Sequence, residues 1–370
     1  MTRTPRPIVV SHLCSPRSPL HQQETTRFLA RWLAGVRGLE YGGDYDPNVH
    51  GGQPTYLVPS HTLKGLKQAR ALQVGGPRDL FGGYVEQPFM ASKVITHPLV
   101  ADGAARPPGW VQALPERIRD SVLPGYSVFA RADAETAAQR LLTEGVVRIK
   151  AARASGGREQ WRVTSQEAFA DWLGEPDCDA MLEGGVVVEL DLAECQTFSV
   201  GQVQVDEHLL SYFGTQHETL DHQGQSVYGG SDLVVVRGDY AELLRLDLAV
   251  PVRLAIEQAR RFDAAADALL TGFYASRRNY DTVQGRDSRG NRRAGVLEQS
   301  WRLGGASSAE IAALQAFIDN PRLNAVRACS FERFEDKPLP ANATVVFRGT
   351  DDELGFLLKY AMVEPYDGQL

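Results

Sequence analysis

Apolar residues recur along the chain in short runs with two different spacings, and these runs predict a mixture of strands and helices. Ile8–Val10 and Thr55–Val58 are apolar runs typical of buried strands, whereas Gln22–Ala34 between them carries apolar residues at helical spacing. A strand, a helix and a second strand in this order predict a small α/β layer with a parallel sheet.

The same two spacings continue through the rest of the chain. We expect further helices at Ala134–Leu142, Gln166–Leu173, Pro251–Leu270 and Ser308–Ile318, the last of these capped by Ser307 or Ser308. We expect strands at Gly145–Lys150, Gly185–Leu192, Phe198–Val205, Leu209–Gly214, Leu233–Val236, Arg278–Gln284 and Ala294–Gln299. The C-terminal segment is predicted to form a strand, Thr344–Phe347, and a helix, Asp352–Ala361.

Composition and charge narrow the class of protein. The 370 residues carry a formal net charge of -7 with no basic tract, which argues against nucleic acid as the main partner. No apolar run reaches the length of a membrane span, and the N-terminus lacks the apolar core of a signal peptide. The four cysteines form no CxxC pair and are expected to be free thiols, so we expect a cytoplasmic protein without a membrane partner. Nothing in the sequence indicates an oligomeric state.

Two motif-like segments do not carry the chemistry that they suggest at first sight. Gly285–Arg292 has the glycines of a phosphate-binding P-loop, but Asn291 stands in the place of the lysine, and a polar hairpin turn is favoured. His217 and His222 are five residues apart, which is about 140° around a helix, so they do not match the spacing of a zinc-protease helix. A loop is predicted there instead.

Three other features combine into one chemistry. The first is a strand that ends at Lys150 and leads into a small-residue loop with Gly156 and Gly157, which can place an ammonium and backbone N–H groups around phosphates. The second is the strand Gly185–Leu192, whose Glu189 and Asp191 can offer a carboxylate to a ribose beside backbone hydrogen bonds to an adenine. Alone, each of these is more simply explained as a solvated lysine or a core strand.

The third feature is the predicted hairpin with Asp281 on one strand and Glu298 on the next. Two carboxylates that face inward from paired strands repel each other unless a cation lies between them, and magnesium suits a sparse oxygen set completed by phosphates and water. Arg302 follows, and its guanidinium can brace a phosphoryl group or a substrate carboxylate. A surface hairpin of mixed charge is the alternative.

In this order, the three features resemble the ATP-grasp superfamily over about residues 90–310. The usual last motif of that superfamily is Glu-x-Asn-x-Arg, and here it is Glu298-Gln299-Ser300-Trp301-Arg302. A serine hydroxyl is a weaker ligand than an amide oxygen, so Ser300 puts two-metal geometry in doubt, and Gln299 is the candidate substitute. The match is to an uncharacterised bacterial branch with no known substrate attached.

The resemblance implies α+β lobes that close on ATP, with Mg²⁺ as the second cofactor. It assigns ATP phosphates to Lys93 and Lys150, with the Gly156–Gly157 loop over them, and magnesium to Asp281, Glu298 and Ser300. It assigns the catalytic roles to Arg302 and Lys150, and the adenine hinge to Glu189, Leu190, Asp191 and Leu192.

The implied fold class is an ATP-grasp fold of α+β lobes preceded by a parallel α/β layer. The expected domains are an N-terminal α/β domain (1–90), the small lobe with a linker (91–195), the large lobe with the metal-binding hairpin (196–330) and a C-terminal strand–helix extension (331–370).

The leading functional hypothesis is an ATP- and Mg²⁺-dependent ligase that activates a small-molecule carboxylate as an acyl phosphate for attack by an amine or thiol. The alternatives are a small-molecule kinase of the same fold, a nucleotide-binding module without turnover, which Ser300 keeps open, and a structural or interaction protein. Candidate substrate contacts are His97, Tyr212, Gln216 and Tyr228, although a buried, hydrogen-bonded histidine is the simpler interpretation of His97. The sequence does not identify the acyl donor or the acceptor.

Overall fold

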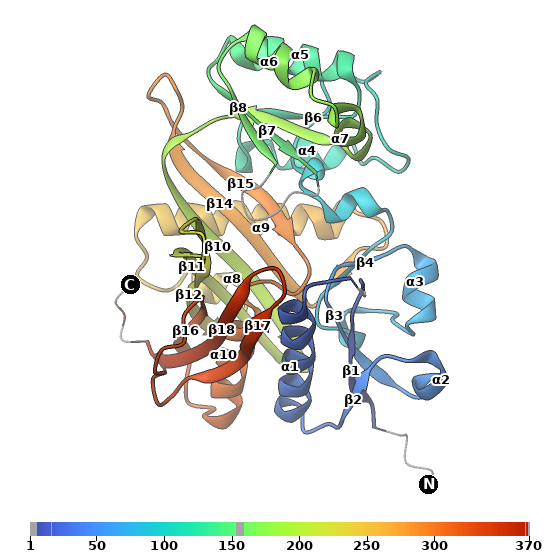
Figure 1. Ribbon diagram of the computed structural model, residues 1–370, viewed down its shortest axis with the longest axis vertical. Helices are drawn as coiled ribbons and strands as arrows, with labels where there is room; N and C mark the ends of the chain where they lie inside the picture. The colour runs from blue at the N-terminus through green and yellow to red at the C-terminus, as the bar shows by residue number, and fades with distance from the viewer. Residues whose placement is uncertain (1–5, 16, 153–158, 367, 369–370) are drawn as a thin grey trace.

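The computed structural model describes residues 6–15, 17–152, 159–366 and 368 of the chain. The strands in these ranges form four sheets, which helices cover, so the protein is a mixed α/β structure (Figure 1). Of the helices described, none combines the length and the apolar composition needed to cross a lipid bilayer.

The N-terminal layer is a parallel sheet with β1 (Ile8–His12) between β2 (Tyr41–Asp44) and β3 (Thr55–Pro59). The helix α1 (Leu20–Val36) joins β1 to β2 and buries Leu29 and Leu33, among others, in one core cluster with apolar side chains of the sheet. The predicted strand–helix–strand unit with a parallel sheet is therefore confirmed. A short helix, α2 (Pro47–His50), precedes β3.

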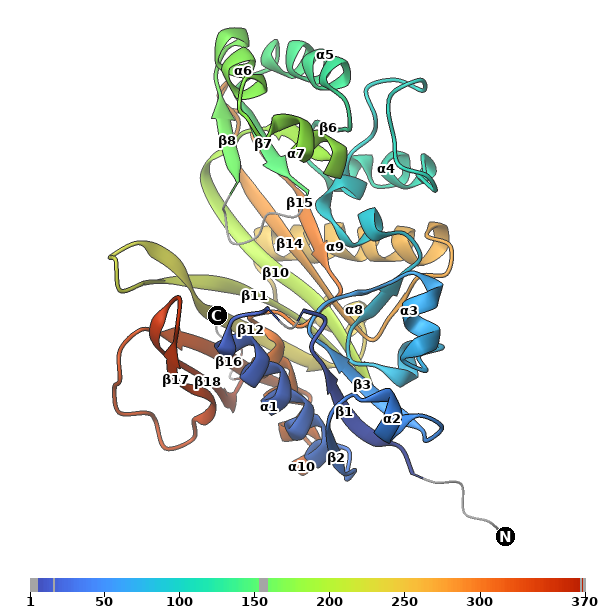
Figure 2. The same cartoon turned by 45° about the vertical axis from the view of Figure 1, so that its right-hand side comes forward.

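A second small sheet joins the N-terminal layer to the rest of the molecule. The strand β5 (Gly83–Val85) lies between β4 (Leu63–Lys64) and β13 (Tyr274–Ala275), and α3 (Leu66–Ala71) follows β4. Because β13 comes directly before the hairpin with the two candidate metal ligands, this sheet connects the start of that hairpin to β5 and β4. Figure 2 shows β1 and β3 of the N-terminal layer below the β14–β15 hairpin.

An antiparallel sheet of four strands, in the order β6-β9-β7-β8, lies at the top of Figure 1, and we refer to it and its helices as the small lobe. Its helices bury alanine, leucine and aromatic side chains against one face of the sheet. The elements of this lobe are β6 (Gly125–Val128), α5 (Arg131–Leu142), β7 (Val147–Ala151), β8 (Gln160–Val163), α6 (Gln166–Leu173), α7 (Cys178–Gly184) and β9 (Val186–Leu190). The helix α4 (Ala113–Arg117) lies in the connection that leads to β6.

An antiparallel sheet of eight strands forms the largest part of the protein, in the order β15-β14-β10-β11-β12-β16-β18-β17. Its strands are β10 (Ala193–Val205), β11 (His208–Leu220), β12 (Ser226–Arg237), β14 (Arg277–Arg286), β15 (Arg292–Ser300), β16 (Ala325–Arg333), β17 (Thr344–Asp351) and β18 (Gly355–Pro365).

Both faces of this sheet are covered, which explains why the segment at residues 233–236 is apolar at every position. Val234 and Val236 point into the core under α9 (Val250–Leu269), whereas Leu233 and Val235 point into the core under α10 (Ser307–Asp319). The helix α1 packs beside α10 on the same face, and α8 (Tyr240–Leu243) follows β12.

The C-terminal segment corrects one prediction. The expected helix Asp352–Ala361 is wrong, because residues 355–365 form β18, which pairs with both β16 and β17. The turn before it needs Gly355 at a φ of +71°, and the aromatic side chains of Phe356, which is partly buried, and Tyr360, which is buried, suit a strand. The hydrogen bonds that β18 forms with a strand on each side outweigh the helical spacing of its apolar residues, which is a local pattern. The extension is thus part of the large sheet.

Two smaller predictions also change. The N-cap position of α10 is Ala306, which has no side chain that can cap the helix, and not Ser307 or Ser308 as predicted. Ser307 is the first residue of the helix, and its Oγ accepts a hydrogen bond from the Gly304 amide. His217 lies on β11 and not in a loop, since β11 continues to Leu220 before the hairpin turn.

Candidate active site

The β14–β15 hairpin places Asp281 and Glu298 directly opposite each other. Asp281 Oδ1 accepts hydrogen bonds from Ser199 Oγ at 2.8 Å, Asn279 Nδ2 at 3.1 Å and Gln216 Nε2 at 3.3 Å. Burial and the negative charge of Glu298 raise the pKa of Asp281, although the hydrogen bonds from Ser199 and Asn279 oppose the rise. The register therefore produces the electrostatic conflict between two carboxylates that the sequence predicts.

Lys93 lies beside this carboxylate pair. Its ammonium is 3.0 Å from Glu298 Oε2, and the Lys93 side chain is 6% exposed. The neighbouring Gln299 donates through Nε2 to the carbonyl oxygens of Met90 and Ser92, at 3.1 Å and 2.8 Å. The hairpin thus holds the Lys93 segment in place through the amide nitrogen of Gln299, whereas Gln299 Oε1 is buried and has no hydrogen-bond partner among the described residues.

A second buried charge cluster lies in the small lobe. Glu189 Oε1 is 2.5 Å from Lys150 Nζ, and Glu189 Oε2 is 2.8 Å from His97 Nε2. Burial alone would raise the pKa of Glu189, but Lys150 and the His97 hydrogen bond hold it at about 2. His97 is fully buried and hydrogen-bonded, which agrees with the simpler of its two interpretations from the sequence. The predicted nucleotide lysine is therefore positioned by an ionised carboxylate.

The predicted adenine hinge is largely occupied by contacts within the protein. The backbone N–H groups of Leu190 and Asp191 donate to carbonyl oxygens at 3.0 Å and 2.8 Å, and the Leu190 side chain is buried in the small-lobe core. The carboxylate of Asp191 pairs with Arg148 and Arg162 at 2.6 Å and 2.8 Å. In the described part of the chain, the backbone N–H of Leu192, which follows β9, donates to no backbone carbonyl oxygen.

Arg302 lies at the end of the hairpin and is held there by a residue that the sequence did not single out. Arg277 donates from Nη1 to the carbonyl oxygens of Ser300 and Arg302 at 3.1 Å and 2.6 Å, and Nη2 is 2.7 Å from Glu310. Burial, and then the charge of Arg277, lower the pKa of Arg302, while Glu298 opposes this. A positive group without a close carboxylate partner among the described residues is suited to a negatively charged substrate.

Ser300 differs from the other two predicted metal ligands in its surroundings. Its hydroxyl lies 3.5 Å from Arg277 Nη1, and Ser300 faces Asn279 across the strand pair. The cation beside it disfavours a metal ion at the Ser300 hydroxyl.

The predicted substrate residues are not equivalent. Gln216 is exposed and donates to both Ser199 and Asp281, so it lies at the carboxylate pair. Tyr228 packs against Gly305, where an added Cβ would lie 2.3 Å from the Tyr228 hydroxyl oxygen. Tyr212 is fully buried and its hydroxyl donates to Glu310 at 2.6 Å, which leaves it in the core beneath the site and out of reach of a substrate.

The carboxyl ends of the N-terminal strands meet the same region, which sequence reasoning missed. Thr62, just after β3, donates through Oγ1 to the Trp301 carbonyl oxygen at 3.1 Å. Burial lowers the pKa of the adjacent His61, and the charge of Arg302 lowers it further. Ligands bind preferentially outside the carboxyl ends of strands in such sheets, and this rule is the signal that could have identified His61.

The residues at the carboxylate pair are compatible with one magnesium ion. Within the described residues, no group of three or more His, Cys, Asp and Glu side chains is arranged to hold a metal. A cation at Asp281 and Glu298 would therefore have two protein carboxylates, and Mg²⁺ is the ion that commonly completes such a set with phosphate oxygens and water. Gly156 and Gly157, predicted to cover the phosphates, lie outside the described residues.

Comparisons with known proteins give one family and several distant structures. The model of a family described as "Protein of unknown function (DUF3182)" matches residues 9–361. No curated protein matches the sequence.

Solved structures similar to the chain include phosphoribosylamine–glycine ligase from Thermotoga maritima, with 11% identity, 97% of this chain and 92% of that chain covered, and a TM-score of 0.49. D-alanyl-alanine synthetase A from Vibrio cholerae has 10% identity, with coverage of 80% and 89% and a TM-score of 0.42. The D-alanine–D-alanine ligase from Coxiella burnetii has 10% identity, with coverage of 85% and 90% and a TM-score of 0.45. Because these TM-scores are below 0.5, we base the functional proposal on the site residues.

Proposed function

The chain belongs to the DUF3182 family, and we propose that it is an ATP- and Mg²⁺-dependent ligase that activates a carboxylate as an acyl phosphate for attack by an amine or thiol. The observation that carries the proposal is the pair Asp281 and Glu298, opposite each other on paired strands, with the Lys93 ammonium 3.0 Å from Glu298. Two facing carboxylates and a buried lysine at one point suit a magnesium-bound polyphosphate.

In this proposal, two lysines bind the phosphates of ATP from different parts of the fold. Lys150 comes from the small lobe, where Glu189 holds its ammonium, and Lys93 comes from the segment that the hairpin clamps. Asp281 and Glu298 would hold Mg²⁺, which neutralises phosphate charge when bound. The guanidinium of Arg302 interacts electrostatically with Glu298 and Asp281. In this proposal it binds the carboxylate substrate or the phosphoryl group in transfer.

The reaction needs no nucleophilic side chain from the protein. A substrate carboxylate oxygen attacks the γ-phosphorus, the bond to the β–γ bridging oxygen breaks, and ADP leaves. The amine or thiol then attacks the acyl carbon of the acyl phosphate, and inorganic phosphate leaves with the bonding electron pair while the nucleophile loses its proton to solvent or a base. The residues named above position the reactants and stabilise charge, which accounts for most catalysis in phosphoryl transfer.

Nucleotide binding is the first test. We expect ATP with Mg²⁺ to stabilise the protein by about 2.7 kcal/mol when its concentration is a hundred times Kd. Glu298→Gln should reduce this stabilisation strongly, whereas Glu183→Gln, an exposed glutamate on α7, should leave it unchanged. No stabilisation of the wild-type protein by millimolar nucleotide would contradict the proposal.

Product analysis then tests the reaction class. Incubation with ATP, Mg²⁺ and panels of carboxylates with amines or thiols should release ADP together with a new amide or thioester. A stable phosphoester product would identify a kinase, and ATP binding without ADP release across the panels would identify a binding module. Either result would refute the ligase assignment while leaving the nucleotide site intact.

A further inference from the structure

A cavity lies at the end of the N-terminal layer opposite the candidate active site. It has a volume of about 470 Å³, and Pro7 and Thr55, at the starts of β1 and β3, are among its lining residues. The candidate active site meets the other end of β3, through Thr62 and Trp301. A five-residue strand is about 16 Å long, so the cavity is separate from the proposed nucleotide site. Its volume is within the range of ordinary small-molecule sites.

One wall of the cavity carries a buried cation with an unused donor. The Arg37 side chain is 8% exposed, and its Nε and Nη2 donate to the two carboxylate oxygens of Asp206. Its guanidinium lies 3.8 Å from the centre of the Tyr56 ring. The remaining nitrogen, Nη1, is buried and has no hydrogen-bond partner among the described residues. Ten buried side-chain atoms among the described residues lack a partner in this way, and two of them, Arg37 Nη1 and the Tyr56 hydroxyl, belong to residues that line this cavity.

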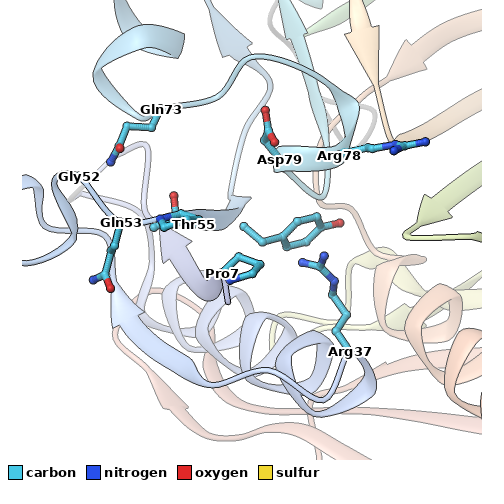
Figure 3. Close-up of a pocket in the computed structure, with 10 residues that line it drawn as sticks. Pro7, Arg37, Gly52, Gln53, Thr55, Gln73, Arg78 and Asp79 are labelled. Carbon is cyan, nitrogen blue, oxygen red and sulfur yellow. The ribbon is translucent and has the colours of Figure 1, made fainter. Parts of the chain in front are cut away.

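The facing wall carries a carboxylate. Asp79 Oδ2 accepts hydrogen bonds from the amides of Gly75 and Gly76 at 2.8 Å and 3.0 Å, which leaves Oδ1 for another donor. Figure 3 shows Arg37 and Asp79 entering from opposite sides of the cavity. The two do not form an ion pair with each other, because Arg37 is committed to Asp206. The side-chain amides of Gln53 and Gln73 add further polar lining.

This arrangement selects for a ligand with both charges. The cavity offers a donor at Arg37 Nη1 and a charged acceptor at Asp79 Oδ1, so a ligand that carries only a carboxylate or only an ammonium would use one of them and leave the other unpaired. We propose that this cavity is a second binding site that takes a small zwitterion, a free α-amino acid, with its carboxylate at Arg37 Nη1 and its ammonium at Asp79 Oδ1. The site is independent of the proposed ligase activity.

Calorimetric titration of the full-length protein with each standard L-α-amino acid tests the site. To exclude an acceptor pocket near the carboxylate pair, the titration uses the Glu298→Gln variant as well as the wild-type protein. We expect at least one amino acid to bind both proteins with one-to-one stoichiometry. Acetate and methylammonium, which carry one charge each, should bind at least tenfold more weakly. The proposal would be overturned if none of the amino acids bound, or if acetate bound with the same affinity as the amino acid that binds best.

Variants then locate the binding. Asp79→Asn keeps an oxygen for the Gly75 and Gly76 amides and removes the charge, so it should weaken binding at least tenfold without unfolding the turn. Gln53→Trp, which fills the cavity, should weaken binding to a similar extent. Arg31→Gln, an exposed arginine on α1, is the matched control and should bind like the wild-type protein. Unchanged affinity in Asp79→Asn and in Gln53→Trp would place any bound amino acid elsewhere and refute the assignment.

Discussion

The buried contact between Lys150 and Glu189 should make a large contribution to the stability of the small lobe. Glu189 is 2% exposed, and its pKa of about 2 lies below the ordinary value of 4.5 because Lys150 and His97 outweigh the effect of burial. This lowering corresponds to about 3 kcal/mol of stability at neutral pH. Since the pKa is depressed, the contribution is present in full above about pH 4.5 and is lost as pH falls towards 2.

Removal of one partner tests this magnitude. Lys150→Met leaves Glu189 as a buried charge with less compensation, so the free energy of unfolding should fall by up to about 3 kcal/mol at pH 7. Lys67→Met, at an exposed lysine on α3, should change it by less than about 0.5 kcal/mol. Urea unfolding followed by tryptophan fluorescence is a suitable assay, because Trp161 and Trp172 both contribute to the small-lobe core.

A double-mutant cycle separates the pair from a general loss of packing. In Lys150→Met/Glu189→Gln neither charge remains, so the double variant should be more stable than the sum of the two single losses predicts, by about 1–3 kcal/mol. Additive losses would show that the two side chains do not interact energetically. That result would refute the conclusion that Glu189 positions the predicted nucleotide lysine.

Three further predictions concern the large sheet and its surroundings. In EDTA, Asp281→Asn should leave the free energy of unfolding unchanged or raise it, because the repulsion that raises the pKa of Asp281 is removed. The same variant should not be stabilised by ATP with Mg²⁺, and a large loss of stability in EDTA would contradict the prediction. Gly201→Ala should cost about 1–3 kcal/mol in urea unfolding, since the new Cβ would lie 2.3 Å from the Tyr212 hydroxyl, and wild-type stability would disprove the close contact. Burial and then Lys359 lower the pKa of His21 from 6.5 to about 4, so the unfolded chain takes up a proton between these pH values that the native protein does not, and stability falls as pH decreases through this window. His21→Leu should flatten this part of the pH profile of urea unfolding, and an unchanged slope would count against the assignment.

The segments with strong periodicity could be predicted from the sequence, because local pattern and tertiary packing agree there. Gln166–Leu173 forms α6 with the predicted bounds, and the predicted strand at residues 233–236 lies within β12. The helix predicted at residues 352–361 fails because β16 and β17 both need a partner in this place. A pairing between segments distant in sequence leaves no mark in a local spacing.

The candidate site shows the same division. The sequence could place Asp281 and Glu298 on the two strands of one hairpin, because the strands and the turn between them follow from the local pattern. Their exact pairing could not be predicted, since an irregularity in the register between Asp281 and Thr282 brings Asp281 opposite Glu298. The contact of Glu189 with His97 could not be predicted either, since 92 residues separate the two. Arg277 was missed because only the structure reveals that it is buried and bonded to the backbone of Arg302.

A crystal structure of the protein with a non-hydrolysable ATP analogue and Mn²⁺ in place of Mg²⁺ tests the central claim most directly. The proposal predicts an anomalous peak bound by Asp281 and Glu298, with the analogue's phosphates within hydrogen-bond distance of Lys93 and Lys150. A structure with the analogue bound elsewhere, or with no manganese at the carboxylate pair at saturating concentrations, would contradict it.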